Sequence, residues 1–223
     1  MVELPLRSIE GHLFVELEGK PWLLDTGSPV SFGEGDRVVL AGREFPLEEE
    51  GFLGLTVSSL AEFTGVACAG LLGGDVLGEF DHLVDVPGGR HVVSAEELDA
   101  PGTDLPLDEM MGVPIVPVTV AGRECGAFFD TGAQLSYWQG DGLESFPAQG
   151  SVEDFYPGVG RFTTETYRVE FRLGGLPFSL RCGRLPGLLG VTLLVAGVEA
   201  IVGNEVLRDR PVAWFPRRGI LRF

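Results

Sequence analysis

The chain of 223 residues has few cysteines, a single lysine and no long apolar run. Its three cysteines, Cys68, Cys125 and Cys182, are widely spaced and odd in number, which favours reduced thiols over a disulfide framework. No apolar stretch approaches the roughly 18 residues of a membrane span, and no basic segment followed by an apolar one indicates a signal peptide. The sequence therefore predicts a cytoplasmic protein with no membrane partner.

Basic residues are also scarce. Sixteen Lys and Arg stand against 33 Asp and Glu, which gives a formal net charge of −17. A field of this sign repels phosphate backbones and anionic surfaces, so we expect no nucleic-acid partner. His12, His82 and His91 have no spacing typical of a metal site or of nucleophile activation, so we expect no metal, no cofactor and no catalytic histidine.

What the chain does contain is an internal duplication. Residues 22–28 (Trp-Leu-Leu-Asp-Thr-Gly-Ser) and 127–133 (Ala-Phe-Phe-Asp-Thr-Gly-Ala) each place an Asp where an apolar strand enters a Thr-Gly turn. A second pair of similar segments follows, 71–73 (Leu-Leu-Gly) and 201–203 (Ile-Val-Gly), and the larger offset indicates an insertion of about 25 residues in the second copy. The repeat predicts two similar halves, 1–100 and 101–223.

The rest of the pattern is typical of strands and turns, so the predicted fold class is all-β. Only two helical signals stand out. One covers residues 58–63 and is stopped by Gly65, and the other covers residues 94–98, where Ser94 and Glu97 have capping-box spacing. The acidic, Pro- and Gly-containing segment 94–111 is predicted to connect the two halves.

Asp25 and Asp130 are the candidate catalytic residues. Two carboxylates brought face to face cannot both ionise cheaply, so the pair shares one proton and can activate a water molecule between them. The alternative is that both are ordinary turn residues, because Asp before Thr-Gly is common turn chemistry. The other acids Asp108, Asp141 and Asp154 stand in polar surroundings and are expected to be solvated loop residues.

With both signatures and both downstream glycine segments in place, nearly the whole chain resembles the aspartic protease family. It combines a pepsin-like bilobal layout with lobes as small as retropepsin subunits. The resemblance implies two lobes related by a pseudo-twofold axis, with terminal strands 2–9 and 219–223 in a sheet between them. It also implies that the hydroxyls of Thr26 and Thr131 bond the backbone of the opposite loop and fix the acid pair. Gly27 and Gly132 would let the turn and the substrate backbone approach closely. The Ser28 side chain would bond an outer carboxylate oxygen, and its counterpart is Ala133.

The resemblance further implies an aspartic endopeptidase that acts on a peptide or protein substrate bound as an extended strand. One chain supplies both acids, so a monomer is expected. Two alternatives stay open: a peptide-binding protein without turnover, and a processing protease with a single target.

The inserted residues predict the flap, the hairpin that folds over bound peptide. The first half is too short to carry one, so we expect the flap in the second half, the reverse of pepsin. Pro and Gly supply turn chemistry for its tip. The candidate substrate-binding residues are Phe155, Tyr156, Gly158, Val159 and Gly160. The alternative is an ordinary surface loop.

Overall fold

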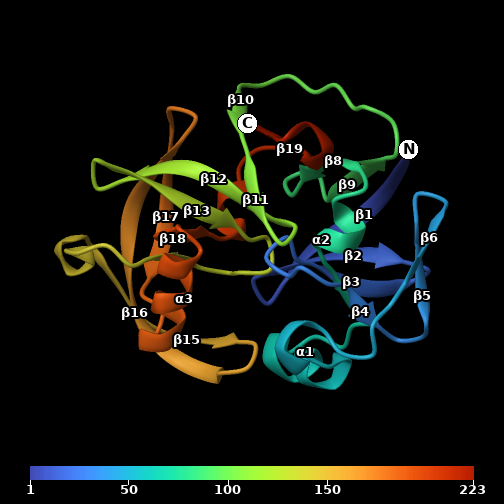
Figure 1. The fold of residues 1–223 in the computed structure, drawn as a ribbon, viewed down its shortest axis with the longest axis horizontal. Coiled ribbons are helices and arrows are strands. Elements are labelled where there is room, and N and C mark those ends of the chain that lie inside the picture. Colours follow the sequence, from blue (N-terminus) through green and yellow to red (C-terminus); the bar gives the residue numbers. More distant parts are fainter.

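The computed structural model describes the backbone of residues 1–223 and every side chain except those of Phe52, Leu188 and Thr192. Two sheet-rich lobes lie side by side (Figure 1). The first lobe is built on a 10-stranded sheet in the order β10-β20-β19-β8-β9-β1-β2-β3-β7-β4. In chain order its strands are β1 (Val2–Ile9), β2 (His12–Leu17), β3 (Lys20–Leu24), β4 (Phe32–Gly33), β7 (Gly70–Leu72), β8 (Asp81–Asp85), β9 (Arg90–Ser94), β10 (Asp104–Pro106), β19 (Val212–Phe215) and β20 (Ile220–Arg222).

This sheet contains strands from both predicted halves. The C-terminal strand β20 pairs with β19, which pairs with β8 of the first half, and β1 pairs with β9. The prediction that the terminal strands enter a shared sheet is therefore confirmed. A separate hairpin, β5 (Arg37–Leu40) and β6 (Arg43–Pro46), forms a two-stranded sheet beside it.

The second lobe is built on an 8-stranded sheet in the order β11-β12-β13-β18-β14-β17-β16-β15. An additional antiparallel pairing of β12 with β16 closes this sheet on itself. Its strands are β11 (Asp108–Met110), β12 (Val113–Val120), β13 (Arg123–Phe129), β14 (Ser136–Trp138), β15 (Ala148–Tyr156), β16 (Gly160–Leu173), β17 (Leu176–Gly183) and β18 (Ala200–Val202).

Short turns with glycine at the second position explain why so many neighbouring strands are antiparallel. Glu10-Gly11 joins β1 to β2, and Met111-Gly112 joins β11 to β12 at the equivalent place in the second lobe. In both turns the two residues have positive φ, the geometry that matches the right-handed twist of the strands. Each turn packs against the other lobe beside its downstream glycine segment: Gly11 O accepts from Asn204 Nδ2, and a Cβ on Gly74 would lie 2.5 Å from Gly112 O.

Helices are few and short. The predicted helix at residues 58–63 is confirmed as α1 (Val57–Thr64), which Thr56 caps and Gly65 ends in the left-handed conformation. Residues 94–98 form no helix, because Ser94 ends β9 and the carbonyls of Ala95 and Leu98 accept hydrogen bonds from Arg217 and Arg218. Two further helices, α2 (Gly74–Leu77) and α3 (Gly187–Val195), were not predicted from the sequence. The short 3-10 turns are η1 (Phe52–Gly54), η2 (Leu143–Ser145), η3 (Asn204–Leu207) and η4 (Pro216–Arg218).

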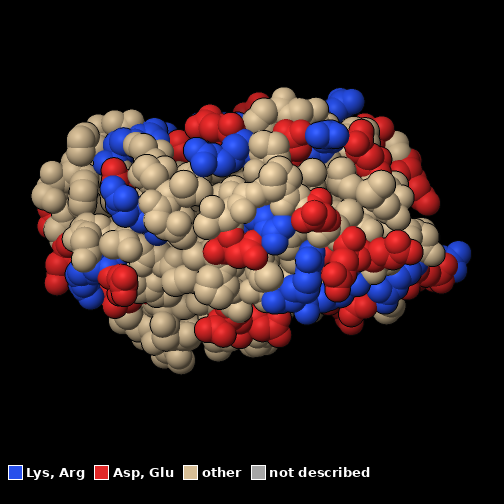
Figure 2. Space-filling model, turned by 90° about the horizontal axis from the view of Figure 1, so that it is seen from above, with Lys and Arg blue, Asp and Glu red and all other residues tan. Residues whose placement is uncertain are grey.

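The surface near the termini mixes both signs of charge. In the view of Figure 2, Lys and Arg side chains are interspersed with Asp and Glu across this face. In the part of the chain that the structure describes, no helix is long and apolar enough to cross a membrane.

A buried histidine pair joins the C-terminal strands to the first lobe. His82 Nε2 bonds Leu77 O (2.7 Å), and its Nδ1 lies 2.9 Å from His91 Nε2. The His82 ring also stacks on Trp214 of β19 at 4.9 Å. Because Leu77 O can only accept, His82 carries its proton on Nε2 and accepts from His91. Burial lowers the pKa of His82 to about 4 and that of His91 well below its usual value, so both rings are neutral near pH 7.

We predict that the histidine pair lowers the free energy of unfolding as the pH falls from about 6.5 to 4. The unfolded chain takes up protons near pH 6.5 but the folded histidines do not, so the stability that they supply above that pH is lost as pH falls. For His82 alone the loss at pH 4 is about 3 kcal/mol. Urea denaturation at both pH values measures it, and the double variant His82→Phe/His91→Phe should show a flatter dependence. An equal slope in both proteins would contradict this assignment.

Candidate active site

Each candidate catalytic Asp follows the last residue of a strand that runs parallel to the downstream glycine segment. Strand β3 pairs with β7, and β13 pairs with β18. The backbone N–H of Asp25 donates to Leu72 O (3.0 Å), and that of Asp130 donates to Val202 O (2.9 Å). The duplicated sequence segments thus meet in pairs and fix where each acid leaves its strand.

The glycines of these segments leave room for the Asp loops. A Cβ on Gly73 would lie 2.8 Å from Ser28 O, and a Cβ on Gly203 would lie 2.3 Å from Leu135 O. Their N–H groups donate to the hydroxyls of Ser31 and Ser136 respectively. A side chain at either glycine would push the loop away from its strand, which explains the requirement for glycine.

The two threonines lock the Asp loops together across the lobes. Thr26 Oγ1 donates to Phe129 O (2.6 Å) and accepts from the N–H of Thr131 (3.0 Å). Thr131 Oγ1 in turn donates to Leu24 O (2.7 Å) and accepts from the N–H of Thr26 (3.0 Å). Both side chains are buried, so this reciprocal network is shielded from water and holds the two loops in one arrangement.

The two carboxyl groups therefore face one another. Oδ1 of Asp25 accepts from the N–H groups of Gly27 and Ser28, and Oδ1 of Asp130 accepts from those of Gly132 and Ala133. Burial raises the pKa of Asp25 well above its usual value, and the charge of Asp130 and a hydrogen bond to it raise that pKa further. Burial also raises the pKa of Asp130. The pair is therefore built to retain a proton.

Ser28 departs from its expected role. Its hydroxyl donates to Val30 O (2.8 Å), so the side chain does not bond a carboxylate, although its backbone N–H does. Serine hydroxyls at turns often bond a backbone carbonyl nearby in sequence, and that local bond is the one formed here. Ala133 provides the equivalent backbone N–H in the second lobe. The two loops are therefore more alike than Ser28 and Ala133 suggest.

Gly27 and Gly132 lie against the opposite carboxyl group. A Cβ on Gly27 would lie 2.3 Å from Asp130 Cγ, and one on Gly132 would lie 2.4 Å from Asp25 Cγ. We predict that Gly27→Ala moves the acids apart and lowers kcat/KM on any cleaved peptide by roughly 10²-fold. Gly187→Ala is the matched control, because nothing lies within 4 Å of its Cβ position. Wild-type activity in folded Gly27→Ala would contradict the geometry.

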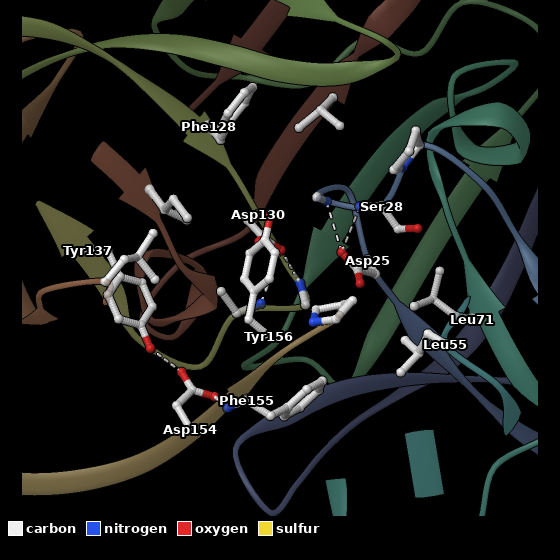
Figure 3. A pocket seen from close by; sticks show the side chains of 18 of the residues that line it. Asp25, Ser28, Leu55, Leu71, Phe128, Asp130, Tyr137, Asp154, Phe155 and Tyr156 are labelled. Carbon is white, nitrogen blue, oxygen red and sulfur yellow. Dashed lines mark hydrogen bonds between the residues drawn. The ribbon is translucent and has the colours of Figure 1, made fainter. Parts of the chain in front are cut away.

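A cavity of about 270 Å³ opens above the acid pair (Figure 3). Its walls are mostly apolar. The first lobe supplies Leu23, Leu55, Leu60 and Leu71, and the second supplies Phe128, Tyr137, Phe162, Leu185, Leu193 and Ile201. The connector between the lobes also contributes Met110 and Met111, which the sequence analysis did not single out.

The predicted flap is a hairpin that reaches the other lobe. Strands β15 and β16 pair up to Tyr156 and Gly160, and the tip lies beside α1 (Figure 1). Phe155 stacks on Phe63 of α1 at 4.7 Å, and Arg161 donates to Glu62 O (3.0 Å). The hairpin therefore bridges the lobes over the cavity.

The five predicted flap residues do not all face the cavity. Phe155 and Tyr156 line it, as does Pro157. Gly158 and Gly160 have positive φ and shape the tip, where a Cβ on Gly158 would contact Leu53. Val159 is 49% exposed and is not among the lining residues.

Two polar residues, Asp154 and His12, lie near the acid pair, where the sequence analysis did not place them. Asp154 was expected to be solvated, but it lines the cavity. Its place on the same face of β15 as Val152 and Tyr156 is a period-2 signal that could have revealed it. His12 is buried beside the second Asp loop, where its Nδ1 lies 3.2 Å from Gly132 O, and burial lowers its pKa.

The architecture is that of an all-β, two-lobed aspartic protease fold, as predicted. Among solved structures, the chain is similar to the aspartic proteinase from Irpex lacteus, with a TM-score of 0.56 and 12% sequence identity over 99% of this chain and 96% of that one. At this identity the likeness shows the fold alone. No protein-family model matches the sequence, and a search of curated proteins finds no match.

Proposed function

We propose that this protein is an aspartic endopeptidase, a hydrolase that cleaves peptide bonds with a water molecule activated between Asp25 and Asp130. The observation that carries the proposal is the meeting of the two duplicated Asp loops, which buries two facing carboxyl groups; burial raises the pKa of both, and the charge of Asp130 raises that of Asp25 further. A purely structural role would not require two confronting acids at the floor of a cavity.

The chemistry follows from one proton shared by two carboxyl groups. The ionised group takes a proton from water as the water oxygen attacks the scissile carbonyl carbon, and the protonated group donates to the carbonyl oxygen. The tetrahedral diol then collapses: the group that had accepted a proton gives it to the leaving amine nitrogen as the C–N bond breaks, and the other group takes a proton back from a diol hydroxyl as the carbonyl re-forms. The acid pair ends as it began, with one proton.

The shape of the cavity favours an extended peptide. Its apolar walls offer pockets for side chains on both sides of the scissile bond, and the β15–β16 hairpin provides a roof. In the first lobe the hairpin β5–β6 contributes no residue to this cavity. The proposal therefore includes a flap from the second lobe. It also includes a monomer, because both acids belong to one chain.

A mixed peptide library scanned across about pH 3 to pH 8 tests the proposal, with cleavage sites read by mass spectrometry. We expect cuts within extended, largely apolar segments. Cleavage of very few sequences would indicate a processing enzyme with one target. Saturable peptide binding by the folded protein without any cleavage would contradict the proposal and favour a binding protein.

A further inference from the structure

The cavity contains a third carboxyl group besides the acid pair. Asp154 lies on the flap strand β15 and projects toward Tyr137 at the second-lobe side of the cavity (Figure 3). Phe162 and Leu193 belong to the same wall, so the carboxyl group is set among apolar side chains. The proposed reaction assigns it no role.

Asp154 has only part of its hydrogen-bonding capacity satisfied by the protein. The hydroxyl of Tyr137 donates to Oδ2, and the N–H of Phe155 donates to Oδ1 (2.8 Å). A carboxylate has about four acceptor sites, so two donors leave room for a further one. Burial raises the pKa of this group and outweighs the lowering effect of the hydrogen bonds from Tyr137 and Phe155.

No cation of the protein balances this carboxylate from within the cavity. Among the described lining residues there is no Lys, Arg or His, and the described ion pairs do not include Asp154. The nearby base is His12; Asp154 raises the pKa of His12, but burial has the larger effect and lowers it, so the ring is mostly neutral near pH 7. The described residues also form no group of three or more His, Cys, Asp or Glu that could hold a metal ion. The missing positive charge is therefore best supplied by a bound peptide.

We propose that Asp154 is a specificity-determining residue that binds a lysine or arginine side chain next to the scissile bond, an inference that rests on the proposed peptidase function. The aliphatic part of such a side chain packs against Phe162 and Leu193, while its charged end reaches the carboxylate. The net charge of −17 adds a long-range attraction for cationic peptides.

The test uses matched peptides that carry lysine or its uncharged analogue norleucine at each position flanking the scissile bond. We expect wild type to prefer lysine by about 10- to 100-fold in kcat/KM, the size of one charge-assisted hydrogen bond in a partly desolvated site. Asp154→Asn should remove most of this preference, because it should lower kcat/KM on the lysine peptide far more than on the norleucine peptide. Glu165→Gln, which removes an exposed charge from β16, is the matched control and should keep the preference.

Tyr137→Phe separates recognition from a structural role. If the Tyr137–Asp154 bond only fastens the flap, Asp154→Asn and Tyr137→Phe will slow both peptides equally and leave their ratio unchanged, which would overturn the inference. Equal cleavage of lysine and norleucine peptides by wild type would overturn it too, while leaving the peptidase proposal intact. No cleavage of any peptide would instead remove both. Calorimetry with the Asp25→Asn variant measures the ratio of the dissociation constants for the lysine and norleucine peptides without turnover, and this ratio should show the same preference for lysine.

Discussion

Replacing Asp25 or Asp130 by Asn is expected to abolish the proposed peptide cleavage and to leave the fold intact. Either change removes the ionisable partner on which the shared proton depends, so we expect kcat/KM to fall by about 10⁴-fold or more. The hydrogen bonds from Gly27 and Ser28 to Oδ1 of residue 25 can be kept by the amide oxygen. Loss of activity is therefore not expected to come from unfolding.

The same variants should be more stable than wild type at neutral pH. The pKa of Asp25 is raised in the folded protein, so the stability that this group supplies at low pH is lost as pH rises above about 4. Asn has no such dependence, and each unit of pKa removed is worth about 1.4 kcal/mol at pH 7. Thermal unfolding at pH 7 and pH 4 measures the difference. Asp141→Asn, at an exposed loop acid, is the control. Retained cleavage in either dyad variant would contradict the proposed function.

Shortening the flap should also lower activity, though less than loss of either acid, without altering the lobes. Replacing residues 156–160 by Asn-Gly keeps the ladder closed at Phe155 and Arg161, because a two-residue turn can join those positions. It removes Tyr156 and Pro157 from the cavity roof. We expect kcat/KM to fall by roughly 10²-fold, since the substrate is less well oriented and water is less well excluded.

The control for this change is Gly174→Asn, which builds an Asn-Gly turn at the opposite end of β16. Gly174 and Gly175 both have positive φ there, so the turn tolerates Asn. Circular dichroism should show the same strand content in both variants. Undiminished turnover by the shortened flap would mean that the hairpin is an ordinary surface loop.

The sequence could predict the parts of the fold that depend on local chemistry. Turns such as Ala41-Gly42 and Ala121-Gly122 indicate hairpins, and the structure has positive φ at all four residues. The duplicated Asp-Thr-Gly and downstream glycine segments predicted one Asp loop per half. The Asp loops were predictable because the same segments occur twice, which indicates that both copies contribute to one site.

Distant contacts decided what the sequence could not predict. Residues 94–98 have a capping-box pattern but form no helix. Arg217 and Arg218 of the C-terminal segment instead donate hydrogen bonds to the carbonyls of Ala95 and Leu98. Helix α3 is an apolar run with glycines, and periodicity cannot distinguish such a run from a buried strand.

The errors at the candidate site have a similar origin. Asp154 stands between polar and aromatic neighbours in sequence; its alternation with Val152 and Tyr156 could have placed it on the cavity face, but its bond to Tyr137 depends on the fold. Ser28 forms a bond to Val30 O that competes with the expected bond to Asp25. Residue type and spacing were thus enough to predict the acid pair. The directions of the neighbouring side chains could be read only from the structure.

The pH dependence of kcat/KM tests the central claim most directly, because it counts the protons that the acid pair must hold. It should be measured with a peptide that has no ionisable side chain, over the range in which circular dichroism shows the protein folded. A pair that works with one shared proton predicts a bell-shaped profile with two limbs, one for each departure from that state. A profile with a single ionisation, or one that persists in Asp130→Asn, would contradict the account.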